Sequence, residues 1–304
     1  MPQVQVYEIS NKAKTRVQIL NFGGAVHGFY LAKQPEQNLV VSTDLDSYAT
    51  NPFNINLMIG RVAGRIKNAQ FELEGNLISL PANQGANCLH GGPHGMAQQW
   101  FEGQLLAPDH LQLTTTLRGQ VDKFPGDLKV TIDYFLSQDN QLQITYTAQA
   151  LEQATVFDPT AHIYWRTFAR PDTCLTIKGQ HIALDPSAIP LAPSHLEAYN
   201  LEQGKRLEQI KQGFDEVYAV QPGLVATLEV PEHYKLEVFG QKNALVVFFA
   251  NPTDFAAHDR GEYSSIALEP QTMPDSLNQP QWGNIRLRAG QQTQVKISFK
   301  VTEV

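Results

Sequence analysis

Short segments in which apolar and polar residues alternate recur along the whole chain. A period of two positions places successive side chains on opposite faces of an extended strand. The segments are 4–9, 16–20, 38–42, 71–80, 111–117, 128–137, 142–150, 174–179, 227–231, 235–240, 244–250, 264–269 and 293–301. This pattern predicts an all-β protein with antiparallel sheets.

Glycine, proline, asparagine and aspartate separate these segments. We expect hairpin turns at 74–76 and 137–141. Helical periodicity is weak, and only short pieces such as 194–199 and 201–209 fit it. Strands spaced about every ten residues without intervening helices argue against a doubly wound α/β fold. No composition shift marks a linker, so we expect residues 1–304 to form one domain.

Composition narrows the class of protein. Hydrophobic residues make up 42% of the 304 residues and charged residues 17%, which is typical of an ordered globular chain. The net charge of −7 argues against nucleic acids and anionic membranes as partners. Nucleotide-binding glycine motifs are absent from the sequence, so no nucleotide cofactor is expected.

The cysteines and the N-terminus bear on location. Cys88 and Cys174 are the only cysteines, and they do not form a Cys-x-x-Cys motif. The first residues, MPQVQVYEIS, lack a secretory signal pattern, and no apolar run approaches the ~20 residues needed to span a membrane. We therefore expect a cytoplasmic protein without a membrane partner.

A carboxylate at the end of a predicted strand is the first candidate for chemistry. Ile266 and Leu268 alternate with Ala267 and Glu269, so Glu269 faces away from the larger apolar side chains. Pro270 disfavours helix at the residue before it and suits a strand edge or the rim of a cleft. Glu269 is either a general base or a surface glutamate at a strand terminus.

The segment GRVAGRI carries two arginines. If it is extended, Arg61, Ala63 and Arg65 share one face, and the two guanidinium groups project together. Fixed arginines bind oxygen-rich ligands well. The alternative is a pair of surface arginines.

Histidines mark two further candidate positions. His90 lies in Leu-His-Gly-Gly, whose glycines permit a tight loop, and His94 follows in a context that breaks any helix. A metal site is therefore not expected there. His162 lies in the aromatic segment HIYWR and faces the same way as Tyr164 and Arg166 if that segment is extended. It is a candidate general acid or a hydrogen-bonded structural residue.

Asp215 follows a glycine turn in GFDE and is a candidate for holding two sugar hydroxyls, or simply a turn residue. Trp100 and Trp165 are candidate platforms for a sugar ring or core residues.

The order of these motifs resembles the aldose 1-epimerase family, the galactose mutarotases. The matching segments are GRVAGRI, NQGANCLHGG, FPGDLKVTIDYFL, DPTAHIYW, GFDE and ALEPQTMPDSLNQPQW. The resemblance implies a large antiparallel β-sandwich of the galactose mutarotase type, whose concave face holds an aldose. It implies Glu269 as general base, His162 as general acid, and Arg61, His90 and Asp215 as sugar-binding groups. Neither a cofactor nor a metal is expected.

The sequence departs from the family pattern at several positions. Gly64 and Asp158 stand where members usually have asparagine, and Glu216 stands where they have histidine. The predicted function is interconversion of the α and β anomers of a hexose such as galactose or glucose, by a monomer or homodimer. A sugar-binding protein without catalysis and a glycoside hydrolase using Asp215 and Glu269 are the alternatives.

Overall fold

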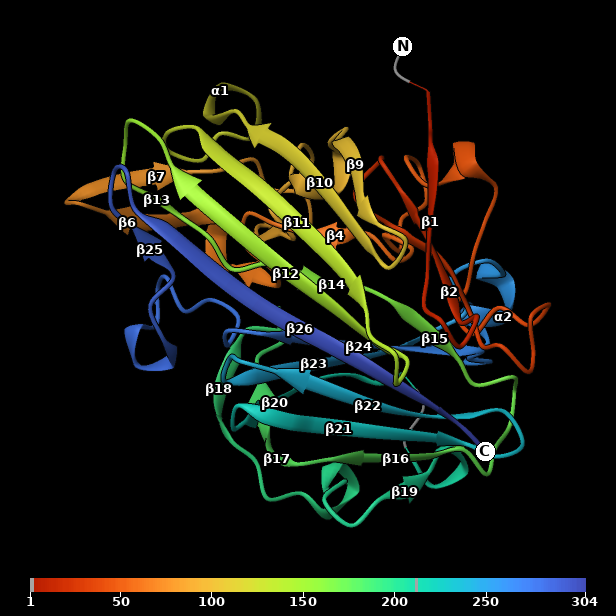
Figure 1. Cartoon of the computed structure of the whole chain (residues 1–304). Coiled ribbons are helices and arrows are strands. Elements are labelled where there is room, and N and C mark those ends of the chain that lie inside the picture. Colours follow the sequence, from red (N-terminus) through yellow and green to blue (C-terminus); the bar gives the residue numbers. More distant parts are fainter. Residues whose placement is uncertain (1–2, 211–212) are drawn as a thin grey trace.

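The computed structural model describes residues 3–210 and 213–304, and antiparallel strands dominate it (Figure 1). The larger sheet has nine strands. Their order is β19 (Lys205–Arg206), β16 (Cys174–Ile177), β21 (Gly223–Val230), β22 (Tyr234–Gly240), β26 (Gln292–Glu303), β12 (Gln141–Ala150), β11 (Leu128–Leu136), β10 (His110–Leu117) and β9 (Glu102–Ala107). The prediction of an all-β antiparallel fold is confirmed.

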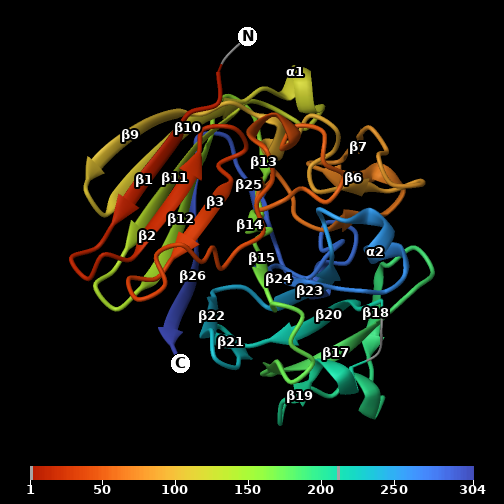
Figure 2. The ribbon, with the colours of Figure 1, turned by 90° about the vertical axis from the view of Figure 1, so that its right-hand side faces the viewer.

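A second sheet has six strands. Their order is β15 (Tyr164–Arg166), β24 (Ser265–Gln271), β23 (Ala244–Ala250), β20 (Asp215–Val220), β17 (Gly179–Leu184) and β18 (Pro190–Pro193). A third sheet of β1 (Val6–Ser10), β2 (Arg16–Leu20) and β3 (Val26–Tyr30) packs against the β9–β11 end of the large sheet (Figure 2).

Short elements complete the described part of the chain. The two-stranded units are β13 (Thr155–Val156) with β25 (Arg286–Leu287), β14 (Thr160–Ala161) with β4 (Met58–Ile59), β5 (Arg65–Ile66) with β8 (Cys88–Leu89), and β6 (Gln70–Leu73) with β7 (Asn76–Ser79). The α-helices are α1 (Gly119–Asp122) and α2 (Phe255–Asp259). The 3₁₀ turns are η1 (Leu45–Ser47), η2 (Lys67–Ala69), η3 (Met96–Gln98), η4 (Glu197–Tyr199), η5 (Leu207–Gln209) and η6 (Pro280–Trp282).

The local predictions can be compared with these elements. The hairpin turns at 74–76 and 137–141 are confirmed, because β6 pairs with β7 and β11 pairs with β12 across them. Neither suggested helical piece forms an α-helix: 194–199 contains the 3₁₀ turn η4, and 201–209 contains the short strand β19 followed by the 3₁₀ turn η5. Both segments are too short to bury an apolar helical face.

The main hydrophobic core lies between the two large sheets. It takes Ile132, Ile144 and Phe299 from the nine-stranded sheet, and Val247 and Leu268 from the six-stranded sheet. These side chains are almost fully buried. Two sheets that share one apolar layer in this way form a β-sandwich.

Strand β24 illustrates how the alternating pattern separates core from site. Ile266 and Leu268 belong to the main core, whereas Ala267 and Glu269 lie on the opposite face of the sheet. Strand β15 pairs with β24 only at 265–267, so Pro270 lies beyond that pairing. The predicted alternation is therefore confirmed, and it directs the Glu269 carboxyl away from the core.

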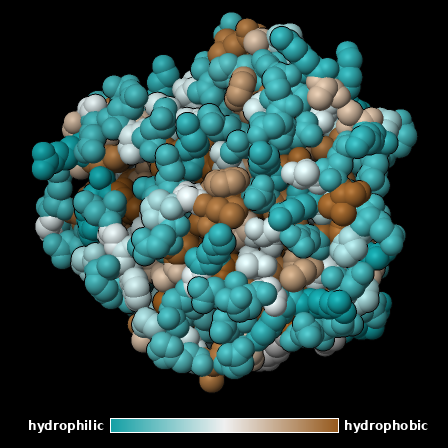
Figure 3. Space-filling model, turned by 60° about the horizontal axis from the view of Figure 1, so that its bottom comes forward, coloured by the Kyte–Doolittle hydropathy of each residue, from teal (hydrophilic) through white to brown (hydrophobic). Residues whose placement is uncertain are grey.

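No helix within the described ranges is long and apolar enough to cross a membrane. The face turned to the viewer in Figure 3 is covered mostly by hydrophilic side chains, with small apolar groups among them. Such scattered apolar groups are ordinary on a protein surface.

Candidate active site

A cavity of about 200 Å³ lies on the face of the six-stranded sheet opposite the main core. The sheet contributes Asp215 and Val217 from β20, Val246 and Phe248 from β23, and Glu269 from β24. Each pair on one strand is two residues apart, so the strand period alone brings these side chains to one face.

Loops and short strands from the first half of the chain form the other walls. They supply the segment 52–54, Gly64 and Arg65, Gln84, and the pair Leu89 and His90. His162 and Tyr164 also line the cavity. The structure thus brings together four of the predicted site residues, namely His90, His162, Asp215 and Glu269.

Glu269 and His162 are in direct contact at the bottom of this cavity. Glu269 Oε1 lies 3.3 Å from His162 Nε2, and the two side chains are 1% and 6% exposed. Glu269 Oε2 and His162 Nδ1 have no hydrogen-bond partner among residues 3–210 and 213–304. Glu269 is therefore not a surface glutamate. It is a buried carboxyl in the cavity lining, and one of its oxygens has no hydrogen-bond partner within the described ranges.

Burial shifts the pKa values of this pair in opposite directions. It raises the pKa of Glu269 well above its ordinary value of 4.5, and nearby Asp215 adds to this effect. It lowers the pKa of His162 to about 4. Both groups prefer their neutral forms, since a low-dielectric environment disfavours charge. Between the lowered pKa of His162 and the raised pKa of Glu269, the pair accordingly holds one proton in total, shared between carboxyl and imidazole.

Backbone hydrogen bonds fix the position of His162. Its N–H donates to the Leu57 carbonyl, and its own carbonyl accepts from the Asn56 N–H. The buried Asn56 side chain also accepts from the Tyr164 N–H at 2.8 Å and donates to the Val26 carbonyl at 2.8 Å. Asn56 is a positioning residue that sequence reasoning missed, because a single asparagine in a loop carries no periodic signal.

His90 faces His162 across the cavity. The ring centroids are 5.3 Å apart and the rings are nearly perpendicular. The Gly64 N–H donates to His90 Nδ1 at 3.2 Å, so the neutral ring carries its proton on Nε2. Burial, together with His162 and Arg65, lowers the pKa of His90 well below 6.5 and maintains this neutral form. His90 is thus an N–H donor suited to a sugar oxygen.

The spacing of His90, His162 and Glu269 would also permit a metal ion, since one ligand atom from each lies within 4.8 Å of the others. Metal binding needs a nitrogen lone pair on each histidine. At His90, the Gly64 N–H occupies the Nδ1 lone pair and the proton lies on Nε2. This hydrogen bond favours a hydroxyl ligand over a metal.

Arg65 and Asp215 form the polar side of the cavity. Arg65 Nη2 lies 3.3 Å from Asp215 Oδ2, and Arg65 Nε donates to Gln84 Oε1 at 2.7 Å. The Arg65 side chain is 14% exposed and that of Asp215 38%. Both groups therefore keep hydrogen-bonding capacity that a bound polar ligand can reach.

The structure contradicts the assignment of Arg61 as a sugar-binding residue. Arg61 is fully buried and lies outside the cavity lining. Its guanidinium donates to both oxygens of Asp122, at 2.7 and 3.1 Å, and to Thr155 Oγ1 at 2.8 Å. The extended geometry that would aim Arg61 and Arg65 together is also wrong, since Gly64 has a φ of +70° and the strand starts only at Arg65.

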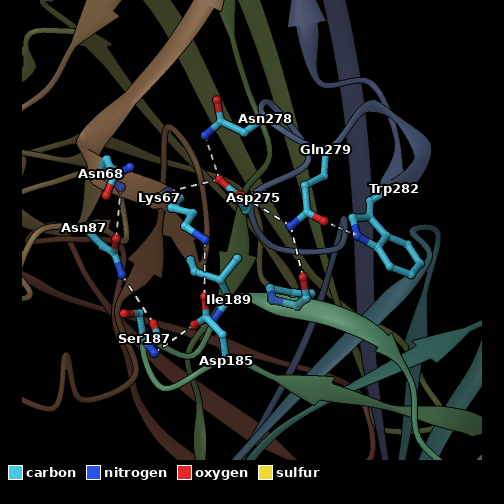
Figure 4. Close-up of polar contacts among 11 residues, drawn as sticks. Lys67, Asn68, Asn87, Asp185, Ser187, Ile189, Asp275, Asn278, Gln279 and Trp282 are labelled. Atoms are coloured by element: carbon cyan, nitrogen blue, oxygen red, sulfur yellow. Dashed lines mark hydrogen bonds and ion pairs between the residues drawn. The ribbon is translucent and has the colours of Figure 1, made fainter.

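Asp275 is the centre of a hydrogen-bond network with Lys67, Asn278 and Gln279 (Figure 4). The Asp275 N–H donates to the Arg65 carbonyl at 2.9 Å. Asp275 Oδ1 accepts from the Lys67 N–H and from Asn278 Nδ2, and Oδ2 accepts from Gln279 Nε2. This network ties the segment after Arg65 to the turn after β24, the strand that carries Glu269.

Of the two alternatives for the tryptophans, the structure supports packing positions rather than sugar platforms. Trp165 is fully buried in the main core, and Trp100 packs on Phe22 outside the cavity lining. The aromatic wall is made instead by Phe53 and Phe248, which are stacked with ring centroids 6.2 Å apart. Phenylalanine is so common in strands and cores that neither residue stands out in the sequence.

Asp158 is a buried carboxyl that joins the segment before His162 to Thr272, the residue after β24. Its carboxylate accepts from the Thr272 N–H at 2.9 Å and from the Thr272 hydroxyl at 2.7 Å. Burial raises its pKa to about 6 from the ordinary value of 3.8. The native state therefore binds this proton more tightly than the unfolded chain does. The resulting stability is fully present below pH 3.8 and is lost as the pH rises through about 6.

Replacing Asp158 with Asn removes this titration while keeping a similar shape. The pKa difference corresponds to about 3 kcal/mol. We expect the free energy of unfolding of the variant, relative to wild type, to rise by about that amount between pH 4 and pH 7.5. Urea unfolding across this range measures it. Asp127→Asn is the control, because Arg118 lowers the pKa of Asp127 and no such rise should occur. A pH-independent difference for Asp158→Asn would contradict the expectation.

Comparison with known proteins identifies the class that this fold and site define. The family model of aldose 1-epimerases matches residues 5–300. A maltose epimerase from Levilactobacillus brevis is 33% identical, over 98% of this chain and 95% of the relative. An aldose 1-epimerase from Streptococcus thermophilus is 33% identical, over 87% of this chain and 84% of the relative.

Solved structures agree on the fold. An aldose epimerase homologue from C. elegans superposes with a TM-score of 0.89 at 21% identity, covering 99% of this chain and all of the other. A galactose 1-epimerase from Lactobacillus acidophilus gives a TM-score of 0.83 at 22% identity, covering 99% and 95%. The predicted sandwich of the galactose mutarotase type is confirmed. The chain belongs to the aldose 1-epimerase family, a family of isomerases.

Proposed function

We propose that the protein interconverts the α and β anomers of a hexose, with Glu269 and His162 as its acid–base pair. The main support for this proposal is the 3.3 Å contact between His162 Nε2 and Glu269 Oε1 in the lining of a cavity of about 200 Å³. Anomer exchange needs a proton removed from the C1 hydroxyl and one delivered to the ring oxygen. Those two oxygens share C1, so the two catalytic groups must also be neighbours.

In ring opening, Glu269 as carboxylate takes the proton from the C1 hydroxyl, and His162 as imidazolium gives a proton to the ring oxygen. The bond between C1 and the ring oxygen breaks, and the C1 carbonyl forms. Rotation about C1–C2 then presents the other face of the carbonyl. In closure the two groups exchange roles, and the single proton of the pair is restored. Each such group typically contributes ~10²–10⁴ in rate.

The other polar groups hold the sugar in this scheme. His90 donates from Nε2 to a sugar oxygen, and Asp215 accepts from hydroxyls. Arg65 replaces Arg61 as the arginine of the site, because it lines the cavity and is partly exposed. Its positive charge stabilises negative charge that develops on a sugar oxygen.

Polarimetry on freshly dissolved α-D-galactose and α-D-glucose, with and without protein, tests the proposal. Acceleration of the approach to the equilibrium rotation is the expected result. Binding of both sugars without acceleration would instead support a non-catalytic sugar-binding protein. Which sugar is preferred is part of the same measurement once maltose is included, since the names of the similar proteins include galactose and maltose.

The shared proton predicts an unusually broad pH profile of kcat/KM. Activity should be lost only when the pair takes up a second proton, at about the lowered pKa of 4 of His162, or loses its one proton above the raised pKa of Glu269. The profile should be measured from pH 3.5 to 9, with circular dichroism to verify folding at the acid end. An acid limb centred near 6.5 would contradict the sharing of one proton.

We also propose that residues 1–304 work as one domain, without a cofactor, in the cytoplasm. The span of the family match supports the first statement. The free state of Cys88 and Cys174 agrees with a reducing compartment. Whether the protein is a monomer or a homodimer stays a prediction, to be measured by light scattering.

A further inference from the structure

An aromatic row leads from the cavity to the protein surface. Phe248 and Phe53 line the cavity, and Phe255 stacks on Phe53 with ring centroids 5.6 Å apart and an angle of 30° between the rings. Phe255, the first residue of α2, is 49% exposed and is not part of the cavity lining. The row therefore continues the apolar wall of the cavity beyond its rim.

The residues of this row are held in place by hydrogen bonds between loops. Asn51 Nδ2 donates to the Pro252 carbonyl at 3.0 Å, which joins the loop before Phe53 to the loop before α2. The Tyr164 hydroxyl donates to the Phe53 carbonyl at 2.9 Å. Phe255 thus presents an exposed aromatic face in direct contact with a lining residue of the cavity, where a ligand that extends beyond the rim can reach it.

The size of the cavity limits how much of a ligand it can enclose. Its volume of about 200 Å³ is below the ~300–1,000 Å³ typical of sites for drug-sized ligands. One pyranose ring is the matching size. A second sugar unit attached to that ring must lie outside the cavity, at the rim where Phe53 and Phe255 are placed.

The chemistry of the rim suits a neutral sugar. Pyranose rings present apolar C–H faces that pack on aromatic rings, while their hydroxyls remain in water. His258 packs edge-on against Phe53 at 4.8 Å and accepts from the Asn251 N–H at Nδ1, so its neutral ring carries a donor at Nε2. Charges nearby on the chain do not favour a phosphate, because Arg260 is paired with Glu262 at 2.8 Å.

We infer that Phe53 and Phe255 form a subsite for the second hexose unit of a reducing disaccharide, whose reducing unit occupies the cavity. This inference rests on the proposed function, and it deepens that function by naming the substrate class. The contact is selective: a monosaccharide in the cavity does not reach Phe255, whereas a disaccharide does.

Maltose and glucose are the probes. The measured quantity is the kcat/KM for maltose divided by the kcat/KM for glucose. In Phe255→Ala this ratio should fall about fivefold, the size expected for loss of one aromatic contact. Phe255→Trp should keep the ratio at or above that of wild type. Phe135→Ala is the matched control, because Phe135 is a 38% exposed phenylalanine on β11 in the other sheet. An unchanged ratio in Phe255→Ala, or an equal fall in Phe135→Ala, would overturn the subsite.

Binding gives a readout that does not depend on turnover. Calorimetric titration of maltose into Glu269→Gln, and into Glu269→Gln combined with Phe255→Ala, should show a Kd about fivefold higher for the double variant. Equal Kd values would overturn the subsite even if wild type were inactive. Conversely, a wild-type protein that accelerates neither sugar, but binds maltose through Phe255, would reject the proposed function and retain the subsite.

Discussion

Replacing Glu269 with glutamine should reduce kcat for anomer exchange by about 10²–10⁴-fold while sugar binding is retained. The amide keeps the size of the side chain but cannot take the proton of the C1 hydroxyl. Glu269 is buried, and one of its oxygens has no hydrogen-bond partner within the described ranges. The polar contact that the substitution changes is therefore the one with His162. Polarimetry measures kcat, and calorimetry measures binding.

Glu216→Gln is the matched control for this experiment. Glu216 also contacts a buried histidine, with its Oε2 2.8 Å from His181 Nε2, but neither residue lines the cavity. The control should keep kcat within a factor of two of wild type. Equal losses in the two variants, or a Glu269→Gln protein with more than a tenth of the wild-type rate, would remove Glu269 from the mechanism.

Replacing Arg61 with methionine should lower the free energy of unfolding by about 3–5 kcal/mol, because it leaves the Asp122 carboxylate buried without its partner. The Arg61 guanidinium makes hydrogen bonds to Asp122, Thr155 and two backbone carbonyls, and none of these groups lines the cavity. Urea unfolding measures the loss. If Arg61→Met does not fold, Asp122→Asn provides a milder break in the same pair.

Arg65→Met should instead reduce sugar turnover more than it reduces the stability of the fold. Its main effect should be a loss of kcat/KM of ten-fold or more, since charge-assisted contacts to a ligand are worth about 1.5–3 kcal/mol. The loss of stability should be smaller, because the Arg65 side chain is partly exposed. An Arg61→Met protein of normal stability but weakened sugar binding would restore Arg61 to the site and contradict this division of roles.

The alternating pattern predicted most of the long strands and the orientation of Glu269, since both follow from a period of two positions. It missed β3, β9, β17 and β20, and the predicted segment 38–42 forms only an isolated bridge at Val40. It could not predict that Glu269 is buried. That depends on loops 52–54 and 84–90 covering the outer face of β24, and these loops are distant in sequence. The opposite pKa shifts of Glu269 and His162 follow from this burial, so they too were beyond sequence reasoning.

The two arginines illustrate a different limit. Sequence spacing favours neither Arg61 nor Arg65, and the assumption of an extended chain placed both on one face. The positive φ of Gly64 interrupts that alternation. Arg61 forms a buried ion pair with Asp122, the last residue of α1. Long-range partners of this kind leave no local pattern, and only the fold distinguishes a structural arginine from one that faces the ligand.

The most direct test of the central claim is exchange spectroscopy on glucose labelled with ¹³C at C1, at anomeric equilibrium, with wild type and with His162→Asn. We predict protein-dependent cross-peaks between the α and β signals for wild type and their loss in the variant. Absence of cross-peaks with wild type for glucose, galactose and maltose alike, or cross-peaks of equal intensity in the variant, would contradict anomer exchange by the Glu269–His162 pair.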